Sequence, residues 1–419
     1  MHTDWHWWVT VVVFTLTYIA LAVGNVPKLR MDRAGIAFVG AGLMLILGVL
    51  TIPQATSPES VDYETLFLLL GMMIVVGFLR IAGFFVRVGH LALDRIKTPR
   101  GLLAATIVLS GILSAFLVND IVCLALTPLV LHLARKQRCN PIPHLIGLAT
   151  AANIGSTGTI TGNPQNMIIG VQSGIPYLHF ALRLMPVALI GLVIDFLVIA
   201  IIYRQALSPL ATNVLTGPAL PDRPPHGRAV IWLLRKSVAV ALVTVILFFC
   251  GLPIALVAIG AAGLLMLNRL RPQRIYREID WTLILMFIGL FMVVHAFQLH
   301  VVSGWGVERW DWILNHPIDR LSIAAAALSN VVSNVPAVLL FEPVIHAMPD
   351  TSRNVAWLAL AMSSTFAGNL TILGSVANLI VVENARREGV NVGFWEYCKV
   401  GIPVTLLTLA IGVAWLMLT

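Results

Sequence analysis

The sequence predicts an all-α integral membrane protein built from two inverted-topology repeats, each with five transmembrane helices, one re-entrant hairpin and one broken helix. Three observations predict this fold: the composition, the recurrence of long apolar runs, and polar residues at matched points of the two halves. Of the 419 residues, 58% are hydrophobic and only 11% are charged, whereas soluble domains carry about 25% charged residues. A helix needs about 20 apolar residues to cross a bilayer, and such runs recur along the chain.

The first half, residues 1–205, is expected to form one complete repeat. Asn119 and Asp120 interrupt the apolar stretch 101–134, which predicts a hairpin that turns at these residues. Gly, Asn, Ser and Thr are concentrated within 144–170, which predicts a span whose helix is broken at membrane depth. The uninterrupted spans of this half are predicted at 7–27, 34–52, 65–86 and 179–203.

A polar, proline-rich stretch separates the two halves, and residues 206–229 are predicted to form a cytoplasmic linker. The second repeat is expected at 230–419. It contains an interrupted stretch at 320–347, which predicts the second hairpin, and a broken span at 355–383. Its uninterrupted spans are predicted at 230–250, 252–268, 281–300 and 399–418.

The basic residues predict how these helices are oriented, because cytoplasmic loops of membrane proteins carry an excess of Lys and Arg. If both hairpins return to the side from which they enter and the N-terminus is periplasmic, all but four of the 27 basic residues lie on the cytoplasmic side. We therefore expect a multi-pass protein of the cell inner membrane, surrounded by membrane lipid. The four exceptions are Arg183, Arg309, Arg320 and Arg353.

The two halves match each other at polar and small residues, in the same order and at offsets near 215. Asp62 and Gly71 correspond to Asp280 and Gly289, and Asn119 corresponds to Asn334. The run TITGNPQN at 159–166 corresponds to TILGSVAN at 371–378. Since each half has an odd number of spans, the halves are expected to face opposite ways, as in many secondary transporters.

The hairpin tips and the broken spans are the expected substrate site. The first tip reads Val118-Asn119-Asp120 and the second reads Ser333-Asn334-Val335. Irregular backbone at membrane depth is tolerated only where it is buried in protein or lines a wet cavity, and the amide and hydroxyl side chains around it can bind a small solute without Lys or Arg. The predicted substrate-binding residues are Asn119, Asn153, Ser156, Thr157, Thr159, Thr161, Gly162, Asn163, Gln165, Asn166, Ser333, Asn334, Thr365, Asn369, Thr371, Gly374, Ser375 and Asn378.

Asp120 is the predicted proton-coupling residue, because an ionisable side chain within the membrane is costly and marks an ion or proton pathway. Its counterpart in the second tip is Val335, so the charge breaks the symmetry of the two halves. The alternative is that Asp120 caps an outgoing helix that begins at Ile121. Asp195, which lies within a predicted span, is the next candidate for a transport role.

Several other function classes lack their sequence signatures. No GxxxxGK[ST] motif for nucleotide hydrolysis occurs, and the basic residues follow the topology rule rather than indicating nucleic acid. The four cysteines form no CxxC pair, so neither a metal site nor another cofactor is expected. A membrane-embedded enzyme would need a nucleophile with its base or paired carboxylates, and we find no GxSxG or HExxH motif.

Four segments of the chain resemble the ion transporter superfamily, over essentially its whole length. They are VNDIVCLALTPLVL (118–131), AANIGSTGTITGNPQNMIIG (151–170), SNVVSNVPAVLL (329–340) and GNLTILGSVANLIV (368–381). That superfamily includes ArsB-type arsenite and antimonite efflux permeases, divalent-anion sodium symporters and NhaD-type sodium/proton antiporters. In the symporters both tips read Ser-Asn-Thr, whereas the Asn119-Asp120 tip followed by LTP (126–128) looks more like the arsenite permeases.

The resemblance implies proton-coupled efflux of arsenite or antimonite. Arsenous acid is an uncharged triol at neutral pH, which amide and hydroxyl groups can bind as donors and acceptors. The alternatives are a sodium- or proton-coupled permease for inorganic anions or carboxylates, and a sodium/proton antiporter. By the same resemblance, some such permeases work with a cytoplasmic ATPase subunit.

Overall fold

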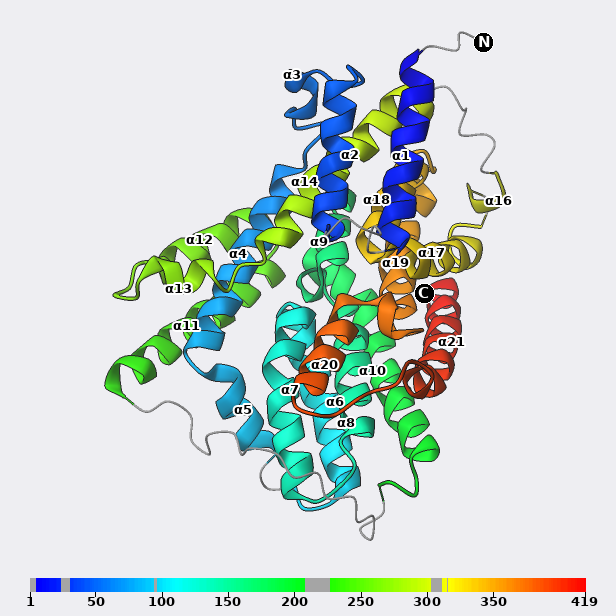
Figure 1. Ribbon diagram of the computed structural model, residues 1–419. Coiled ribbons are helices and arrows are strands. Elements are labelled where there is room, and N and C mark those ends of the chain that lie inside the picture. The colour runs from blue at the N-terminus through cyan, green and yellow to red at the C-terminus, as the bar shows by residue number, and fades with distance from the viewer. Residues whose placement is uncertain (1–4, 24–30, 94–95, 208–226, 303–310, 315) are drawn as a thin grey trace.

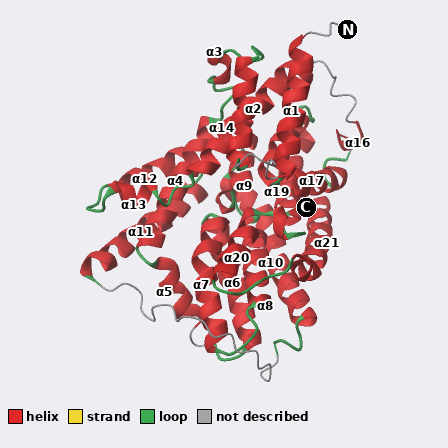
Figure 2. Cartoon of the chain, viewed as in Figure 1, coloured by secondary structure: helices red, strands yellow, loops and turns green. Residues whose placement is uncertain are grey.

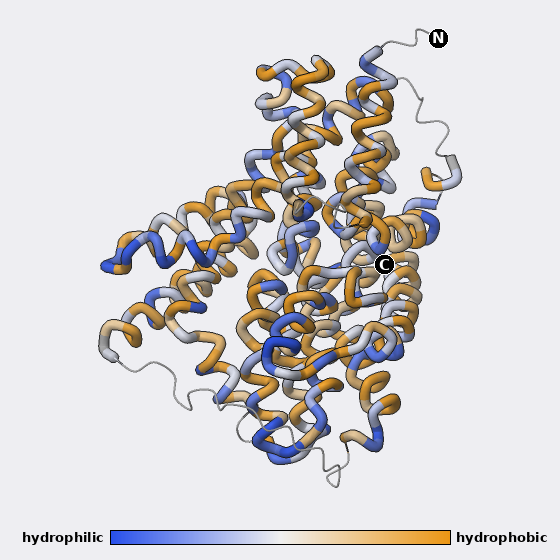
Figure 3. The backbone as a smooth tube through the Cα atoms, viewed as in Figure 1, coloured by the Kyte–Doolittle hydropathy of each residue, from blue (hydrophilic) through white to orange (hydrophobic). Residues whose placement is uncertain are grey.

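The computed structural model describes residues 1–419 except 1–4, 24–30, 94–95, 208–226, 303–310 and 315. The described residues form helices joined by loops and contain no strand (Figure 2). Apolar residues cover most of the helical surface, and hydrophilic residues gather toward the ends of several helices (Figure 3). Among the residues that the structure describes, seven helices are long and apolar enough to cross a membrane, and α2, α12 and α18 are shorter apolar helices. The fold is therefore that of a multi-span, all-helical membrane protein.

The first half runs from α1 to α10 (Figure 1). Its hairpin is α6–α7, and its broken span is α8–η1–α9. The helices are α1 (Trp5–Val23), α2 (Arg33–Ile46), α3 (Ile52–Ala55), α4 (Tyr63–Ile81), α5 (Phe84–Leu93), α6 (Pro99–Phe116), α7 (Asn119–Lys136), α8 (Ile142–Ser156), η1 (Ile160–Gly162), α9 (Pro164–Ser173) and α10 (Tyr177–Ile202).

The second half shows the same order of a hairpin, a broken span and a long final helix. Its hairpin is α17–α18, and its broken span is α19–η4–α20. The helices are α11 (Arg228–Phe249), α12 (Ile254–Met266), α13 (Pro272–Tyr276), α14 (Trp281–Phe297), η2 (Gln298–Val302), α16 (Asp311–Leu314), α17 (Asp319–Val332), α18 (Asn334–His346), α19 (Asp350–Ala367), η4 (Ile372–Gly374), α20 (Val376–Arg387) and α21 (Phe394–Leu418).

Some predicted spans differ from the helices. The span predicted at 65–86 is divided into α4 and α5, because Gly83 adopts a positive φ of 74° that ends the first helix. The span predicted at 34–52 ends earlier, at Ile46. The first arm of the first hairpin, α6, is itself long enough to cross a membrane, so re-entry stays a prediction. The linker predicted at 206–229 lies almost entirely outside the described residues.

Two close helix crossings join the halves. α4 packs against α12, and α2 packs against α14. At the first crossing, a Cβ on Gly71 would lie 2.6 Å from the carbonyl carbon of Ala258; at the second, a Cβ on Gly289 would lie 2.7 Å from that of Ala37. Only glycine allows backbones to approach so closely. The glycines matched in the sequence thus occupy equivalent contacts.

Each hairpin contacts the broken span of the other half. α20, the second segment of the later broken span, packs against α7, and α9 packs against α18. The first hairpin lies in the lower half of the view in Figure 1, whereas α18 lies in the upper half. The two polar tips therefore approach the broken spans from different directions.

Candidate functional site

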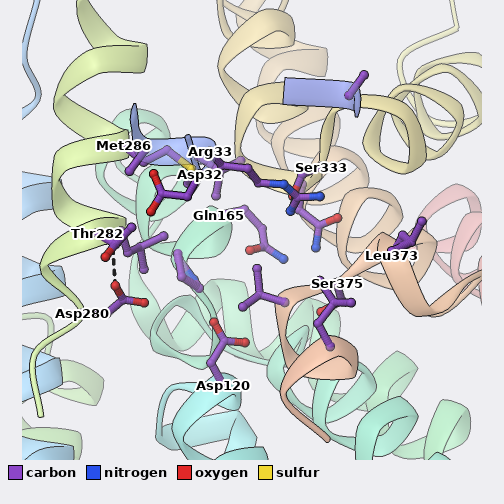
Figure 4. A pocket seen from close by; sticks show the side chains of 18 of the residues that line it. Asp32, Arg33, Asp120, Gln165, Asp280, Thr282, Met286, Ser333, Leu373 and Ser375 are labelled. Carbon is purple, nitrogen blue, oxygen red and sulfur yellow. Dashed lines mark hydrogen bonds between the residues drawn. The ribbon is translucent and has the colours of Figure 1, made fainter. Parts of the chain in front are cut away.

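A cavity of about 550 Å³ lies where the two hairpin tips and the two broken spans meet. Figure 4 shows side chains from several elements directed toward one space, with Asp120 below and Arg33 and Ser333 above. The residues predicted from the sequence that line this cavity are Asn119, Asp120, Gln165, Ser333, Asn334 and Ser375. Both tips therefore contribute to one cavity.

Four charged side chains line the cavity, and three of them were not predicted. Asp32 and Arg33 come from the start of α2, and Asp280 precedes α14. The Arg33 guanidinium donates to Ser333 Oγ at 3.4 Å, which links the α1–α2 region to the second tip. In the sequence, Asp32 and Arg33 look like part of a basic cytoplasmic loop. In the sequence, the match of Asp280 to Asp62 was the feature that could have drawn attention to Asp280. That match indicated a repeat of the two halves and not a place in the cavity.

The two tips differ in backbone geometry. Ser333 has φ 81° and ψ 162°, a conformation that is strained for any residue other than glycine. It separates α17 from α18, so the second hairpin turns at one strained residue. The first hairpin turns at Leu117 and Val118 in extended or polyproline-like conformations, with negative φ at both.

Asp120 lies in the first turn of α7, which begins at Asn119. Val118 is the N-cap residue, and no side chain makes a capping hydrogen bond there. The alternative in which Asp120 caps a helix beginning at Ile121 is therefore wrong. A carboxylate in the first turn still interacts favourably with the helix dipole, but its position leaves it on the cavity wall.

A cluster of asparagines lies behind the cavity, with Asn153 of α8 at its centre. Asn119 Nδ2 donates to Asn153 Oδ1 at 3.0 Å, and Ser375 Oγ donates to the same oxygen at 3.0 Å. Asn153 Nδ2 in turn donates to Asn369 Oδ1 at 2.8 Å and to Asn378 Oδ1 at 3.0 Å. The cluster thus connects the first tip to both broken spans, and Asn153, Asn369 and Asn378 are not among the residues that line the cavity.

Each broken span is held open by one asparagine amide. Asn166 Nδ2 donates to the carbonyls of Ser156, Thr157 and Thr159, the last at 2.9 Å. Asn378 Nδ2 donates to Gly368 O at 2.7 Å and Thr371 O at 3.1 Å. These amides donate hydrogen bonds to backbone carbonyls that lose their helical partners where the helix is broken.

The glycine of each break allows a tight turn. A Cβ on Gly162 would lie 2.2 Å from Ser156 O, and a Cβ on Gly374 would lie 2.8 Å from Gly368 O. Ser156 and Gly368 occupy equivalent positions, as do Gly162 and Gly374, at a constant offset of 212 residues. The two breaks are therefore built in the same way.

The remaining predicted site residues support the breaks rather than line the cavity, and they are buried except for Thr371, which is half-buried. Thr159 Oγ1 donates to Ala115 O, and Thr161 Oγ1 pairs with Tyr177 OH at 2.8 Å. Asn163 caps α9 by accepting from the backbone N–H of Asn166 at 2.8 Å. The hydroxyls of Ser156 and Thr157 bond to the carbonyl of Asn153, and only the backbone carbonyl of Thr371 enters the network.

Gln165 connects the first broken span to the second half. Its Nε2 donates to Thr365 Oγ1 at 3.1 Å. With the Asn334 amide oriented so that both of its atoms are paired, Asn334 Oδ1 accepts from Gln165 Nε2 at 3.2 Å and Nδ2 donates to Ser364 O at 3.1 Å. Gln165 therefore holds the second tip while it lines the cavity.

A second, much smaller cavity of about 30 Å³ lies near the other end of α14 and α18. That volume corresponds to about one water molecule. Its lining includes Glu59 and Asp62 before α4, His295 of α14 and Glu342 of α18. Gln172 of α9 also lines it and donates to Asp62 Oδ2 at 3.0 Å. Within the described ranges, no group of His, Cys, Asp and Glu is arranged to hold a metal ion.

Comparison with known proteins finds similarity to membrane transporters. The model of the citrate transporter family (CitMHS) matches residues 16–367. The silicon efflux transporter LSI3 of Oryza sativa subsp. japonica is 31% identical, with 96% of each chain covered. A Dictyostelium discoideum protein, provisionally named the transporter arsB, is 25% identical over 96% of this chain and 90% of its own. The crystal structure of the Alcanivorax borkumensis YdaH transporter shares the fold, with a TM-score of 0.55 at 15% identity, over 98% of this chain and 96% of its own.

Proposed function

This chain belongs to the citrate transporter (CitMHS) family of membrane transporters, and from that premise we propose that it exports arsenite and antimonite from the cell in exchange for protons. The observation that carries the proposal is the cavity that both tips line. Its polar groups are amides, hydroxyls and carboxyls, which suit an uncharged solute with several hydroxyl groups.

The charges of the cavity support an uncharged solute over a multivalent anion. Among the residues that the structure describes, the lining holds the carboxyl groups of Asp32, Asp120 and Asp280 and one guanidinium, that of Arg33. A citrate ion would meet a net negative lining among these residues, and like charges repel one another. Arsenous acid and antimonous acid meet no such repulsion. The two relatives named for silicon efflux and for arsB are consistent with uncharged hydroxylated solutes.

Proton coupling is proposed to lie at Asp120. Uphill transport of an uncharged solute requires a coupled ion. Asp120 lies at the first tip, makes no described hydrogen bond and faces the space in which the solute would bind. A carboxyl in that position can exchange a proton with the cavity as the solute arrives or leaves.

An inverted arrangement of residues 1–205 and 230–419 is part of the proposal. It is supported by the recurring order of hairpin, broken span and final helix, by the paired Gly71 and Gly289 crossings and by the equivalent breaks. The large and small cavities then correspond to an open and a closed side of one pathway. By the distribution of basic residues, the large cavity opens to the cytoplasm and the N-terminus is periplasmic.

Arg33 specifically favours one alternative, a carboxylate or inorganic-anion permease, because its guanidinium could bind an oxyanion bidentately. The Arg33→Gln variant separates the two. For an uncharged solute we expect transport to fall less than tenfold, whereas for an anion bound by the half-buried Arg33 we expect a loss of more than about tenfold. Arg80→Gln is the matched control, since Arg80 pairs with Glu278 outside the cavity.

Flux measurements in proteoliposomes test the function directly. We expect an imposed pH gradient to drive accumulation of radiolabelled arsenite, and an imposed sodium gradient not to do so. Citrate, succinate and silicic acid are measured in parallel. Saturable citrate flux with arsenite at background would reject the proposal in favour of the carboxylate permease, and sodium-for-proton exchange without solute flux would favour the antiporter.

A further inference from the structure

Asp195 is a buried carboxyl outside the cavity that the proposed mechanism does not use. It lies on α10 and is 0% exposed. Its Oδ2 lies 3.0 Å from Thr150 Oγ1 of α8, and its Oδ1 has no hydrogen-bond partner. Its only described polar contact is therefore a single hydroxyl group.

The distances from Thr150 Oγ1 to its neighbouring oxygens bear on the protonation state of Asp195. Thr150 Oγ1 lies 2.8 Å from Ile146 O, which can only accept, and 3.0 Å from Asp195 Oδ2. A hydroxyl has one proton. If that proton is donated to the shorter contact, a lone pair of Oγ1 faces Asp195, and the contact is attractive only when Oδ2 carries a proton.

The opposite assignment is less favourable. If Thr150 donated to an ionised Asp195, the carboxylate would rest on one hydrogen bond, with Oδ1 unpaired and no ion pair to a cation described. An ionised carboxylate buried in this way is costly, whereas a neutral carboxyl tolerates an unpaired carbonyl oxygen much better. The protonated form pairs Ile146 O, Thr150 Oγ1 and Asp195 Oδ2, and it leaves unpaired only the carbonyl oxygen Oδ1.

We propose that Asp195 is a second proton-binding site, occupied in this conformation and linked through α8 to the solute cavity. The proposal deepens the proton coupling proposed above and rests on it only for the effect on transport. The ligand is a proton. The site is the Asp195 carboxyl together with the Thr150 hydroxyl 3.0 Å away, which in the protonated form would accept from Oδ2.

A chain of hydrogen bonds connects this site to the first tip. The backbone carbonyl of Thr150 accepts from Asn369 Nδ2 at 3.2 Å. Asn369 Oδ1 accepts from Asn153 Nδ2 at 2.8 Å, and Asn153 Oδ1 accepts from Asn119 at 3.0 Å. Deprotonation of Asp195 would require the Thr150 hydroxyl to turn away from Ile146 O. The hydroxyl would turn on Thr150, and the backbone carbonyl of the same residue accepts the hydrogen bond from Asn369 of the asparagine cluster.

Helices α6, α8, α11, α19 and α21 pack against α10. Of their ionisable groups, Tyr397 of α21 has a buried hydroxyl without a described partner. Several other ionisable groups on these helices have partners away from Asp195. His144 bonds to Pro99 O and Asn140 O, and Lys236 bonds to Leu264 O. Arg353 pairs with Asp350, and Glu396 pairs with Lys399. The remaining ionisable side chains described on these helices are Arg100, Arg235 and Cys398.

Infrared difference spectroscopy on the purified full-length protein tests occupancy without any solute. At neutral pH we expect the C=O stretching band of a protonated carboxylic acid in the wild type. Asp195→Asn should remove that contribution, while Asp120→Asn should leave it. Identical carboxylic-acid bands in wild type and Asp195→Asn, with equal thermal stability of both, would overturn the proposal.

A pair of matched hydroxyl variants tests the geometry. Thr150→Val removes the acceptor of the proton and should shift the Asp195 band to the frequency of a carboxyl without a hydrogen bond. Thr408→Val is the control, because the buried Thr408 hydroxyl bonds only to carbonyls of its own helix. An unshifted band in Thr150→Val would show that Thr150 does not accept the proton.

Transport measurements test whether the proton leaves during the cycle. Asp195→Asn mimics the occupied site, so we expect exchange of labelled arsenite to continue while accumulation driven by a pH gradient is lost. Full pH-driven accumulation in this variant would show that the Asp195 proton is not released during the transport cycle. If the wild type carries no arsenite, the proposed function fails, but the infrared result still decides whether Asp195 binds a proton.

Discussion

At the scale of single residues, the Asp120→Asn variant separates two roles of the Asp120 carboxyl: proton coupling and stabilisation of the start of α7. Because Val118 is the N-cap and Asp120 makes no capping bond, Asp120→Asn should cost at most about 0.3–1 kcal/mol through the helix dipole. We expect the variant to bind and exchange solute but to lose pH-driven accumulation, as measured by uphill arsenite flux with and without a pH gradient.

The control for this prediction is the thermal stability of the purified variant, which should be close to that of the wild type. Undiminished pH-driven flux in Asp120→Asn would place coupling elsewhere, with Asp195 next in line. Strong destabilisation would instead indicate that the carboxylate supports the first tip.

Ser333 is the other residue with a separate prediction, because its φ of 81° is strained for a residue with a Cβ. Such strain costs about 1–3 kcal/mol. Ser333→Gly should therefore raise the unfolding free energy by about 1 kcal/mol, measured by thermal or chemical denaturation in detergent. Ser333→Ala keeps the Cβ and removes only the hydroxyl, so it should give no such gain. Equal stability of the Gly and Ala variants would contradict a strained tip.

At the scale of elements, much of the local structure could be predicted because glycine and amide residues act over short distances. The breaks at Gly162 and Gly374 were predicted from the runs around them, and each is a short 3-10 turn. The amide that holds each break, Asn166 or Asn378, lies within the same run. A local pattern of this kind contains both the turn and its hydrogen-bond partner.

The lining of the cavity was harder to predict, because the residues of α9 from Pro164 to Gly170, which include Gln165 and Asn166, are all buried. Periodicity distinguishes faces only when one face is exposed. The sequence therefore identified the polar residues without showing that Gln165 and Ser375 face the cavity while Asn166 and Asn378 hold the backbone. Arg33 was missed for a different reason: its contact with Ser333 joins residues 300 positions apart.

The helix crossings give a prediction with built-in controls. Gly71→Ala and Gly289→Ala should each destabilise the protein by about 1–3 kcal/mol, because the added Cβ would meet backbone atoms that cannot move aside. Gly260→Ala and Gly263→Ala on α12 have open space at the Cβ, so they should be neutral or slightly stabilising. Fluorescence-detected gel filtration after heating measures all four. Equal melting of the two pairs would contradict the crossings.

At the scale of the whole molecule, the orientation of the two halves in the membrane can be tested by cysteine accessibility. Cys250 is exposed and is first replaced by serine, whereas Cys123, Cys139 and Cys398 are buried. We expect cysteines at Arg100 and Lys136 to be labelled by an impermeant thiol reagent from the cytoplasm. Cysteines at Arg320 and Arg353 should be labelled from the periplasm.

Labelling of Arg100 and Lys136 from different sides would mean that the first hairpin crosses the membrane fully. The same holds for Arg320 and Arg353 at the second hairpin. Lys136 is preferred to its neighbour Arg135, because Arg135 pairs with Glu388 at 3.1 Å and is only slightly exposed. Permeabilised cells, in which all four positions should react, control for reactivity.

The asparagine cluster has a consequence for how the protein is made. Asn153 and Gln165 belong to the half that leaves the ribosome first, but their partners Asn369, Asn378 and Thr365 belong to the half that leaves last. At about 5–20 residues per second, a nascent chain waits roughly 10–40 s for those partners. During that interval, amide groups at membrane depth lack the hydrogen bonds that make their burial tolerable. We therefore expect the chain to be most exposed to membrane quality-control proteases after its first half has been inserted. It should become resistant to these proteases only when its last third has been inserted.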